Sequence, residues 1–200
     1  MTDLLLTDEE LNSKVSELMI EFGNSKSNGS DNSEFQDIVN SKDEVVGTLP
    51  RGVIWDNNLQ SNTRVVNIFV VDGEKKILLP VRSLKKRYLP GGFDFSCGEN
   101  LQAGEEYKEA AIRGLKEELG LAGLNVSEMG SFKPDPNNGF YCFGKVYMAK
   151  VLSGAEIHAN LEEVSEIRWF DAQEIKEMLV DQKEKFKRDY KSIFELAFYS

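Results

Sequence analysis

The sequence predicts an α/β fold, in which helices sandwich a mixed β-sheet, and three observations favour it. First, β-branched and apolar runs recur along the chain with few helical stretches between them. Second, residues 105–119 form one strong amphipathic pattern, with apolar residues at helical spacing. Third, 40% hydrophobic and 10% aromatic residues in a chain of 200 suffice for a buried core, which excludes a disordered, collagen-like or coiled-coil protein.

The N-terminal part of the chain divides at a polar segment. Residues 7–22 predict an amphipathic helix, because a Thr-x-x-Glu capping box precedes apolar residues at helical spacing. Residues 23–33 consist almost entirely of Gly, Ser, Asn and charged residues, which predicts a flexible linker. We therefore expect an acidic helix with its linker over 1–33 and one domain over 34–200.

From residue 35 onward, strand and turn signals alternate. The segments Asn40–Asp43 and Asp72–Glu74 are typical hairpin turns. We expect strands at 37–40, 44–47, 65–71, 76–79, 139–151 and 165–170, and helices at 105–119, 172–180 and 182–198. No internal repeat is present.

The charge balance limits the possible partners. Acidic residues outnumber basic ones by 34 to 24, which gives a formal net charge of −10. That sign disfavours general binding to nucleic acid polymers or to anionic membranes. An acidic protein that handles phosphates instead needs a local basic cluster or a divalent cation.

The cysteines and the N-terminus indicate a cytoplasmic protein. Cys97 and Cys142 are the only cysteines, which disfavours a disulfide scaffold and indicates two reduced thiols. Because His158 is the only histidine and no C-x-x-C motif occurs, a structural zinc site is not expected. The acidic N-terminus lacks the features of a signal peptide, and no apolar stretch reaches membrane-spanning length.

Carboxylates gather on the helix predicted at 105–119. Glu117 and Glu118 are adjacent, about 100° apart around the helix, so both can reach a hard cation such as Mg²⁺. Glu105 precedes Arg113 by about two turns, where it can pair with the arginine. The residues alone leave two interpretations open, a metal site and an ordinary solvated acidic face.

The spacing of this segment resembles the Nudix box, the loop–helix signature of the Nudix superfamily. The matching positions are Glu105, Arg113, Leu115, Glu117, Glu118, Gly120 and Leu121. The resemblance implies a Nudix-type α/β/α sandwich with a mixed β-sheet, and hydrolysis of a diphosphate linkage with Mg²⁺ or Mn²⁺. It also implies that Arg113 and Glu105 brace the loop, and that metal is held by Glu117, Glu118, Gly98 and Glu99.

Flanking segments narrow the resemblance. Residues 82–94 are similar to the segment before the box in Nudix proteins related to isopentenyl-diphosphate isomerase, which implies phosphate contacts by Arg82 and Lys86. The isomerase activity itself is not expected, because its metal site depends on several histidines and this chain has only His158.

Two positions depart from the box. Glu99 stands where the family has its first glycine, so it either distorts the loop or adds a carboxylate ligand. Gly114 stands where the family has the glutamate after the arginine, a position assigned to metal binding or water activation. Either the substrate needs the space at Gly114, or the site has drifted. By position, Glu163 or Glu166 would supply the missing acid, unless both are surface acids of an edge strand.

We therefore expect a metal-dependent hydrolase that cuts a diphosphate linkage in a small molecule, such as a nucleoside diphosphate linked to another group. The alternative is a Nudix-fold binding module that has lost catalysis at Gly114. Phe132, Phe140, Tyr141 and Phe143 flank a loop and either stack on a base or belong to the strands and the core. The resemblance also allows a homodimer, which no particular residue indicates.

Overall fold

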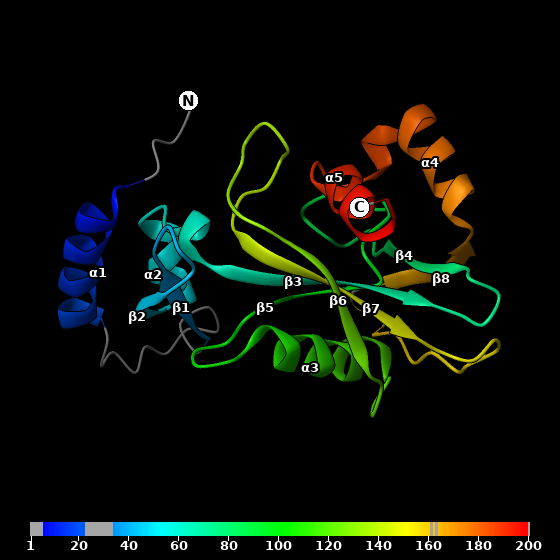
Figure 1. Ribbon diagram of the computed structural model, residues 1–200, viewed down its shortest axis with the longest axis horizontal. Helices are drawn as coiled ribbons and strands as arrows, with labels where there is room; N and C mark the ends of the chain where they lie inside the picture. The colour runs from blue at the N-terminus through cyan, green and yellow to red at the C-terminus, as the bar shows by residue number, and fades with distance from the viewer. Residues whose placement is uncertain (1–5, 23–33, 161, 163, 200) are drawn as a thin grey trace.

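A mixed sheet lies at the centre of the computed structural model, which describes residues 6–22, 34–160, 162 and 164–199 (Figure 1). Its strands are β3 (Arg64–Val71), β4 (Ile77–Arg82), β5 (Cys97–Asn100), β6 (Val126–Phe132), β7 (Phe143–Lys150) and β8 (Val164–Phe170). They are ordered β6–β7–β3–β4–β8, with β5 pairing β3 off this path. β3 runs parallel to β7, and the other pairs are antiparallel, so the predicted mixed sheet is confirmed.

Helices cover both faces of this sheet, which confirms the predicted α/β/α sandwich. α3 (Tyr107–Leu119) lies against one face, and α4 (Ala172–Asp181) and α5 (Tyr190–Phe198) lie on the other (Figure 1). Because successive side chains of a strand point to opposite faces, Ile68 packs in the cluster under α3 and Phe69 packs in the cluster under α5. β3 is therefore buried along nearly its whole length.

The C-terminal segment corrects one prediction, a continuous helix over 182–198. A short 3₁₀ turn, η3 (Lys183–Lys185), is followed by extended backbone, and α5 begins only at Tyr190. The ring of Phe186 is buried and stacks on Phe93, with 5.3 Å between ring centres. The Phe93 N–H also donates to the carbonyl of the residue before Phe186 at 2.7 Å. Tertiary packing thus overrides the helical pattern of this segment.

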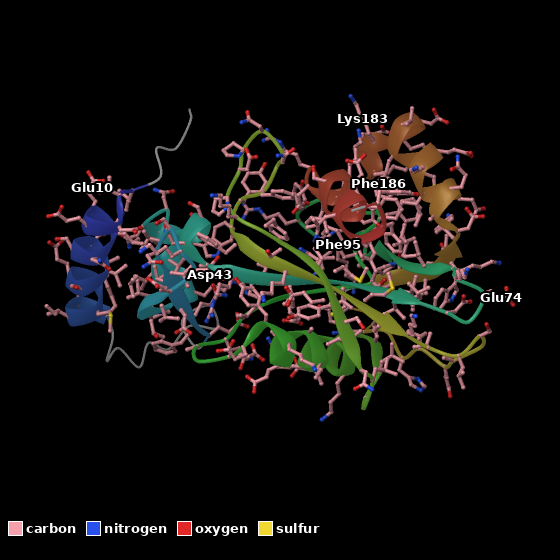
Figure 2. The ribbon with its side chains drawn as sticks, in the orientation of Figure 1. Glu10, Asp43, Glu74, Phe95, Lys183 and Phe186 are labelled. Atoms are coloured by element: carbon pink, nitrogen blue, oxygen red, sulfur yellow. The ribbon has the colours of Figure 1, made fainter. Side chains whose placement is uncertain are left out.

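Aromatic rings fill the layer between the sheet and α5. Phe95 stacks on Tyr190 at 4.8 Å, and Phe69 meets the Tyr190 ring edge-on at 6.1 Å. Phe95 and Phe186 are both labelled in Figure 2, between the sheet and α5. This layer anchors the chain just before β5, where the candidate site begins.

A third hydrophobic cluster joins the N-terminal elements. These elements are α1 (Asp8–Phe22), β1 (Phe35–Val39), β2 (Val45–Pro50) and α2 (Arg51–Asp56), and the 3₁₀ turn η2 (Gln60–Asn62) follows them. The predicted capping box is present, because the Thr7 N–H and hydroxyl both donate to the Glu10 carboxylate. Gly47 allows α1 to approach β2, since a Cβ there would lie 2.4 Å from Val15 Cγ1 and 2.7 Å from Met19 Sδ.

Most other predicted elements are present with shifted ends. The hairpins β1–β2 and β3–β4 are confirmed, whereas α2 and β6 were not predicted, and β7 begins at Phe143 rather than at 139. The expected linker 23–33 lies outside the described residues, so its flexibility and a domain division after residue 33 stay predictions. In the described part of the chain, no helix is long and apolar enough to cross a membrane.

We predict that Gly47→Ala loosens the packing of α1 on β2. The added methyl group would fall within contact distance of Val15, so either the helix or the strand must move, at a cost of about 1–3 kcal/mol of unfolding free energy. Urea unfolding would measure this loss, and amide hydrogen exchange should show it concentrated in residues 8–22. Lys42→Ala, in the exposed turn of the same hairpin, is the control. Equal protection of α1 in the two variants would contradict the prediction.

Candidate active site

The helix α3 and the loop before it carry most of the candidate residues. The helix begins after Glu106, where Glu106 and Glu109 form a capping box. This is two residues later than the sequence predicts. It ends at Gly120, whose left-handed φ of +68° is readily adopted by glycine. Leu115 and Leu119 lie on the buried face of α3, against the sheet.

The N-terminal hairpin fastens the loop that precedes α3. The Asp37 carboxylate accepts hydrogen bonds from Arg64 Nη2 at 2.9 Å, the Gly104 N–H at 2.8 Å and Thr48 Oγ1 at 2.7 Å. The side chains of Asp37 and Arg64 are only 5% and 8% exposed, so this charged pair is buried and also hydrogen-bonded to its surroundings. Elements far from the box in sequence therefore help to position it.

Arg113 ties the loop, the strand β5 and the helix together. Its Nε and Nη2 donate to the two carboxylate oxygens of Glu105 at 2.8 and 3.0 Å, so the predicted pairing is present in bidentate form. Nη1 donates to Glu99 at 3.0 Å and to the exposed Glu117 at 3.3 Å. Nη2 also donates to the Asn100 carbonyl at 3.0 Å. One guanidinium thus holds both sides of the loop in place.

The Arg113–Glu105 pair stays ionised. Hydrogen bonds with Glu105 raise the pKa of Arg113 above its usual range, although burial opposes this shift. Burial raises the pKa of Glu105, but hydrogen bonds from Arg113 and from the Gln102 backbone outweigh it, so the pKa of that carboxyl lies below its ordinary value. Because neither group changes its charge near neutral pH, this pair is a structural brace.

Glu118 and Glu99 form a pair of facing carboxyl groups. Glu118 projects from α3, Glu99 projects from β5, and the two carboxyl groups lie close enough for Glu99 to affect the pKa of Glu118. Burial raises the pKa of Glu118 well above its ordinary value, and the nearby negative charges of Glu99 and Asp94 raise it further. Two carboxylates this close repel one another unless a proton or a cation lies between them.

Cys97 lies against this pair but has no chemical role in it. The residue is 1% exposed, and burial, followed by the charges of Glu118 and Glu99, raises the pKa of its thiol well above the ordinary value. Such a thiol stays protonated and is a poor nucleophile. Cys97 is thus a free and buried thiol, in agreement with the prediction that the cysteines form no disulfide.

Gly114 brings α3 close to β5. A Cβ on this residue would lie 2.4 Å from Glu99 Cγ and 2.8 Å from Cys97 Sγ. The space beside Gly114 is therefore filled by Glu99 of the protein itself. Of the two alternatives for Gly114, a space reserved for substrate is therefore disfavoured, because Glu99 and Cys97 occupy that space.

Basic side chains meet next to the carboxyl pair, at Asp94. Arg82 Nη1 pairs with Asp94 Oδ2, and Arg82 Nε and Nη2 donate to the Tyr88 carbonyl at 3.1 and 3.0 Å. Lys187 Nζ pairs with Asp94 Oδ1 at 2.6 Å and lies 5.5 Å from the centre of the Phe95 ring. Lys187 was missed in the sequence because residues 182–198 fit a single helix. No local pattern marks it, since its position depends on the packing of the preceding phenylalanine.

The other predicted site residues that the structure describes lie on or beside strands of the sheet. Gly98 is exposed within β5, and Lys86 is half-buried in the segment after β4. Glu166 lies on β8, half exposed, where it pairs with Arg168 at 2.7 Å. Glu163 lies outside the described residues. The loop and the helix bring together Glu99, Glu105, Arg113, Glu117 and Glu118.

The aromatic residues near the loop after β6 belong mainly to the packing. Phe132 stacks on Phe140 with 4.6 Å between ring centres, and Phe143 is buried. Tyr141 is exposed, and its hydroxyl accepts a hydrogen bond from Arg188 at 2.9 Å. The packing interpretation therefore holds for the three phenylalanines.

The described residues include no group of three or more Cys, His, Asp or Glu side chains arranged as a ready-made metal cage. The facing pair of Glu118 and Glu99 nevertheless suits Mg²⁺, which is commonly held by one or two carboxylates together with waters and substrate phosphates. A hollow of about 90 Å³ lies beside Glu99 and Arg113, between the loop and the N-terminal hairpin.

Comparison with known proteins identifies the family. The model of the NUDIX domain matches residues 61–190. The chain belongs to the Nudix family. It is 34% identical over 142 residues to the uncharacterised Nudix hydrolase YfcD of Escherichia coli K12, covering 71% of this chain and 76% of that protein. It is also 34% identical over 132 residues to the uncharacterised Nudix hydrolase PA4841 of Pseudomonas aeruginosa, covering 66% and 75% of the two chains.

Solved structures agree with this assignment. DR0079 from Deinococcus radiodurans superposes with a TM-score of 0.72 at 29% identity, covering 82% of this chain and 99% of that one. The Nudix domain of Shewanella oneidensis NrtR, complexed with ADP-ribose, gives a TM-score of 0.52 at 15% identity, covering 67% and 84%. At that identity the second comparison shows the fold alone.

The family match establishes the class of enzyme. The chain is a Nudix pyrophosphohydrolase, an enzyme of a family that hydrolyses pyrophosphate-containing small molecules. The resemblance to the Nudix box is thereby confirmed. The narrower resemblance to proteins related to isopentenyl-diphosphate isomerase is not confirmed by these comparisons.

We predict that Arg113→Lys lowers the unfolding free energy by about 2 kcal/mol. A lysine keeps the charge but cannot make the bidentate bonds to Glu105 while reaching the Asn100 carbonyl and Glu99. Urea unfolding would measure the loss. Arg51→Lys, at the solvent-exposed pair with Glu34, is the matched control and should change stability by less than about 0.5 kcal/mol. Equal unfolding midpoints for the two variants would show that Arg113 is no brace.

Proposed function

We propose that this enzyme hydrolyses a diphosphate linkage in a nucleoside diphosphate joined to another group, and that the reaction depends on Mg²⁺ or Mn²⁺. The observation that carries the proposal is the facing pair of Glu118 and Glu99 beside the Arg113 brace. A chain with a net charge of −10 repels a diphosphate, so catalysis requires local positive charge at this pair.

The donor set suits a hard cation. Glu118 and Glu99, with the Gly98 carbonyl next to them, would hold Mg²⁺ or Mn²⁺ through oxygen atoms. When bound, such an ion polarises the phosphorus–oxygen bonds and activates a water molecule. Glu117 is 57% exposed and bonded to Arg113, so it would join the ligands by turning its side chain. Arg113 and Glu105 would keep the loop fixed while the charge at the site changes.

Basic residues would bind the diphosphate. Arg82 is the last residue of β4, Lys86 lies in the segment after it, and Lys187 comes from the segment before α5. Arg82 and Lys187 both pair with Asp94, so a bound phosphate would compete with this carboxylate for the same donors. Arg82 can present several parallel donors to phosphate oxygens, whereas the lysines act as point charges.

The general base is assigned to the segment before and within β8. The Asn160 N–H donates to the Glu118 carbonyl at 3.1 Å, so this segment is fastened beside the C-terminal end of α3. Glu163 and Glu166 are the candidates in it, and Glu166 would have to leave Arg168 in order to act. A homodimer and a cytoplasmic location remain predictions.

We predict that Glu118→Gln lowers turnover by about 100-fold or more without unfolding the protein. The amide keeps the shape of the side chain but removes the negative charge that would hold the metal ion. Product release from a panel of nucleoside-diphosphate derivatives, with Mg²⁺, Mn²⁺ or EDTA, would measure the effect. Glu177→Gln, on the exposed side of α4, is the control. Wild-type turnover in Glu118→Gln, or undiminished turnover in EDTA, would refute the metal assignment.

We predict that Lys187→Gln lowers kcat/KM for a diphosphate substrate by about tenfold, mainly through KM. The variant removes a positive charge at Asp94, which would weaken attraction for the anionic substrate. Steady-state kinetics would separate KM from kcat, and thermal unfolding would check the fold. Lys183→Gln, which removes an exposed charge in η3, should leave both constants unchanged. Identical kinetics for the two variants would exclude substrate contact by Lys187.

A further inference from the structure

Glu99 and Gly114 depart from the Nudix pattern in opposite senses. The pattern has glycine where this chain has Glu99, and it has glutamate where this chain has Gly114. The two positions are 15 residues apart in the chain but lie on neighbouring elements, β5 and α3. One structural cause can therefore account for both departures.

The two residues compete for one space. Cys97 and Glu99 are alternate residues of β5, and both side chains approach Gly114 of α3. A Cβ on Gly114 would lie 2.4 Å from Glu99 Cγ, whereas non-bonded carbon atoms pack at about 3.5–4.0 Å. No side chain fits at position 114 while Glu99 is in place. The glycine in the helix is thus a steric requirement of Glu99, the nearer neighbour, and of Cys97, whose Sγ would lie 2.8 Å from the same Cβ.

The carboxyl group of Glu99 also reaches the neighbour that a helix glutamate would have. Position 114 precedes Glu118 by four residues, so side chains at these two positions are neighbours on one face of α3. Glu99 lies against position 114 from the strand, and its carboxyl group is near enough to Glu118 to raise the pKa of that residue. Its Oε2 accepts a hydrogen bond from Arg113 Nη1 at 3.0 Å, and the side chain keeps 20% of its surface exposed. The carboxylate is therefore fixed in direction and still open to a ligand.

We propose that Glu99 supplies, from strand β5, the metal-binding carboxylate that α3 lacks at Gly114, and that the two residues are one compensated exchange. The inference rests on the metal-dependent hydrolase proposed above. Under this inference Gly114 does not mark lost chemistry, because the carboxylate has moved and has not disappeared. Glu163 and Glu166 are then not needed as substitutes for the glutamate that α3 lacks at position 114.

Reciprocal substitution of Glu99 and Gly114 tests whether the two residues compete for one space. Gly114→Glu alone should crowd Glu99 and lower Tm, whereas the double variant Glu99→Gly/Gly114→Glu should return Tm to within a few degrees of the wild type. Gly114→Ala is the smaller probe. It should lower Tm less in the Glu99→Gly background than in the wild type, because the 2.4 Å contact with Glu99 Cγ is gone and Cys97 Sγ, at 2.8 Å, is the close neighbour that remains. If the Tm changes of the single variants simply add in both double variants, the two residues do not share one space and the proposal is overturned.

Binding of Mn²⁺ in the absence of substrate tests whether Glu99 is a metal ligand. We expect Glu99→Gln, which keeps the shape of the side chain, to weaken Mn²⁺ binding measured by electron paramagnetic resonance about tenfold or more, while Tm is retained. Glu99→Gly should weaken binding similarly, and Glu99→Gly/Gly114→Glu should restore it to within about threefold of the wild type. Glu177→Gln should bind Mn²⁺ like the wild type.

The outcomes separate this inference from the proposed function. If Glu118→Gln loses Mn²⁺ while Glu99→Gln binds it like the wild type, Glu99 is no ligand and the inference is overturned, but the hydrolase assignment stands. If the double variant recovers Tm without Mn²⁺ affinity, the residues share only space, which also overturns the inference. If the wild type neither binds Mn²⁺ nor turns over a diphosphate, the proposed function fails and this inference fails with it.

Discussion

The close approach of α3 to β5 is the constraint on which the whole site depends. Because Gly114 has no side chain, the helix lies near enough to the strand for Glu118 and Glu99 to face one another. When both groups are ionised, their mutual repulsion pushes the two elements apart unless something opposes it. Arg113 opposes it, since its guanidinium donates to Glu99 on the strand side while it holds Glu105 in the loop. Removing the arginine would leave the partly buried carboxylates of Glu99 and Glu105 without their cation, which is costly.

The surrounding layers bring positive charge into an acidic protein at one place. Lys187 reaches Asp94 only because Phe186 leaves the helical path and packs on Phe93 in the aromatic layer. Arg82 meets the same carboxylate from the end of β4. A chain with a net charge of −10 can thus attract a phosphate locally, because packed backbone fixes the cations where their own repulsion would otherwise separate them.

The sequence predicted the parts of this arrangement that depend on local spacing. Glu105 lies about two turns before Arg113, and a spacing of that kind needs only the regular geometry of a loop and a helix. The strand β6 escaped prediction because its side chains are mostly exposed or half-buried, so it lacks a clear alternation. The sequence did not predict the contact that explains Gly114, nor the position of Lys187, for a different reason. Each depends on contacts between segments that only the folded chain brings together.

The direction of a carboxylate on a strand is set by strand pairing, whereas the direction of one on a helix is set by the helix itself. The direction of Glu99 depends on the pairing of β5 with β3, where it lies opposite Val66, and a slip of one residue would turn it to the other face of the sheet. Cys97 shares the face of Glu99 and is buried to 1% exposure, whereas Gly98 between them is exposed. Burial of the thiol stabilises this register and disfavours the slipped one. A cysteine with no part in the chemistry therefore helps to point the carboxylate toward Glu118.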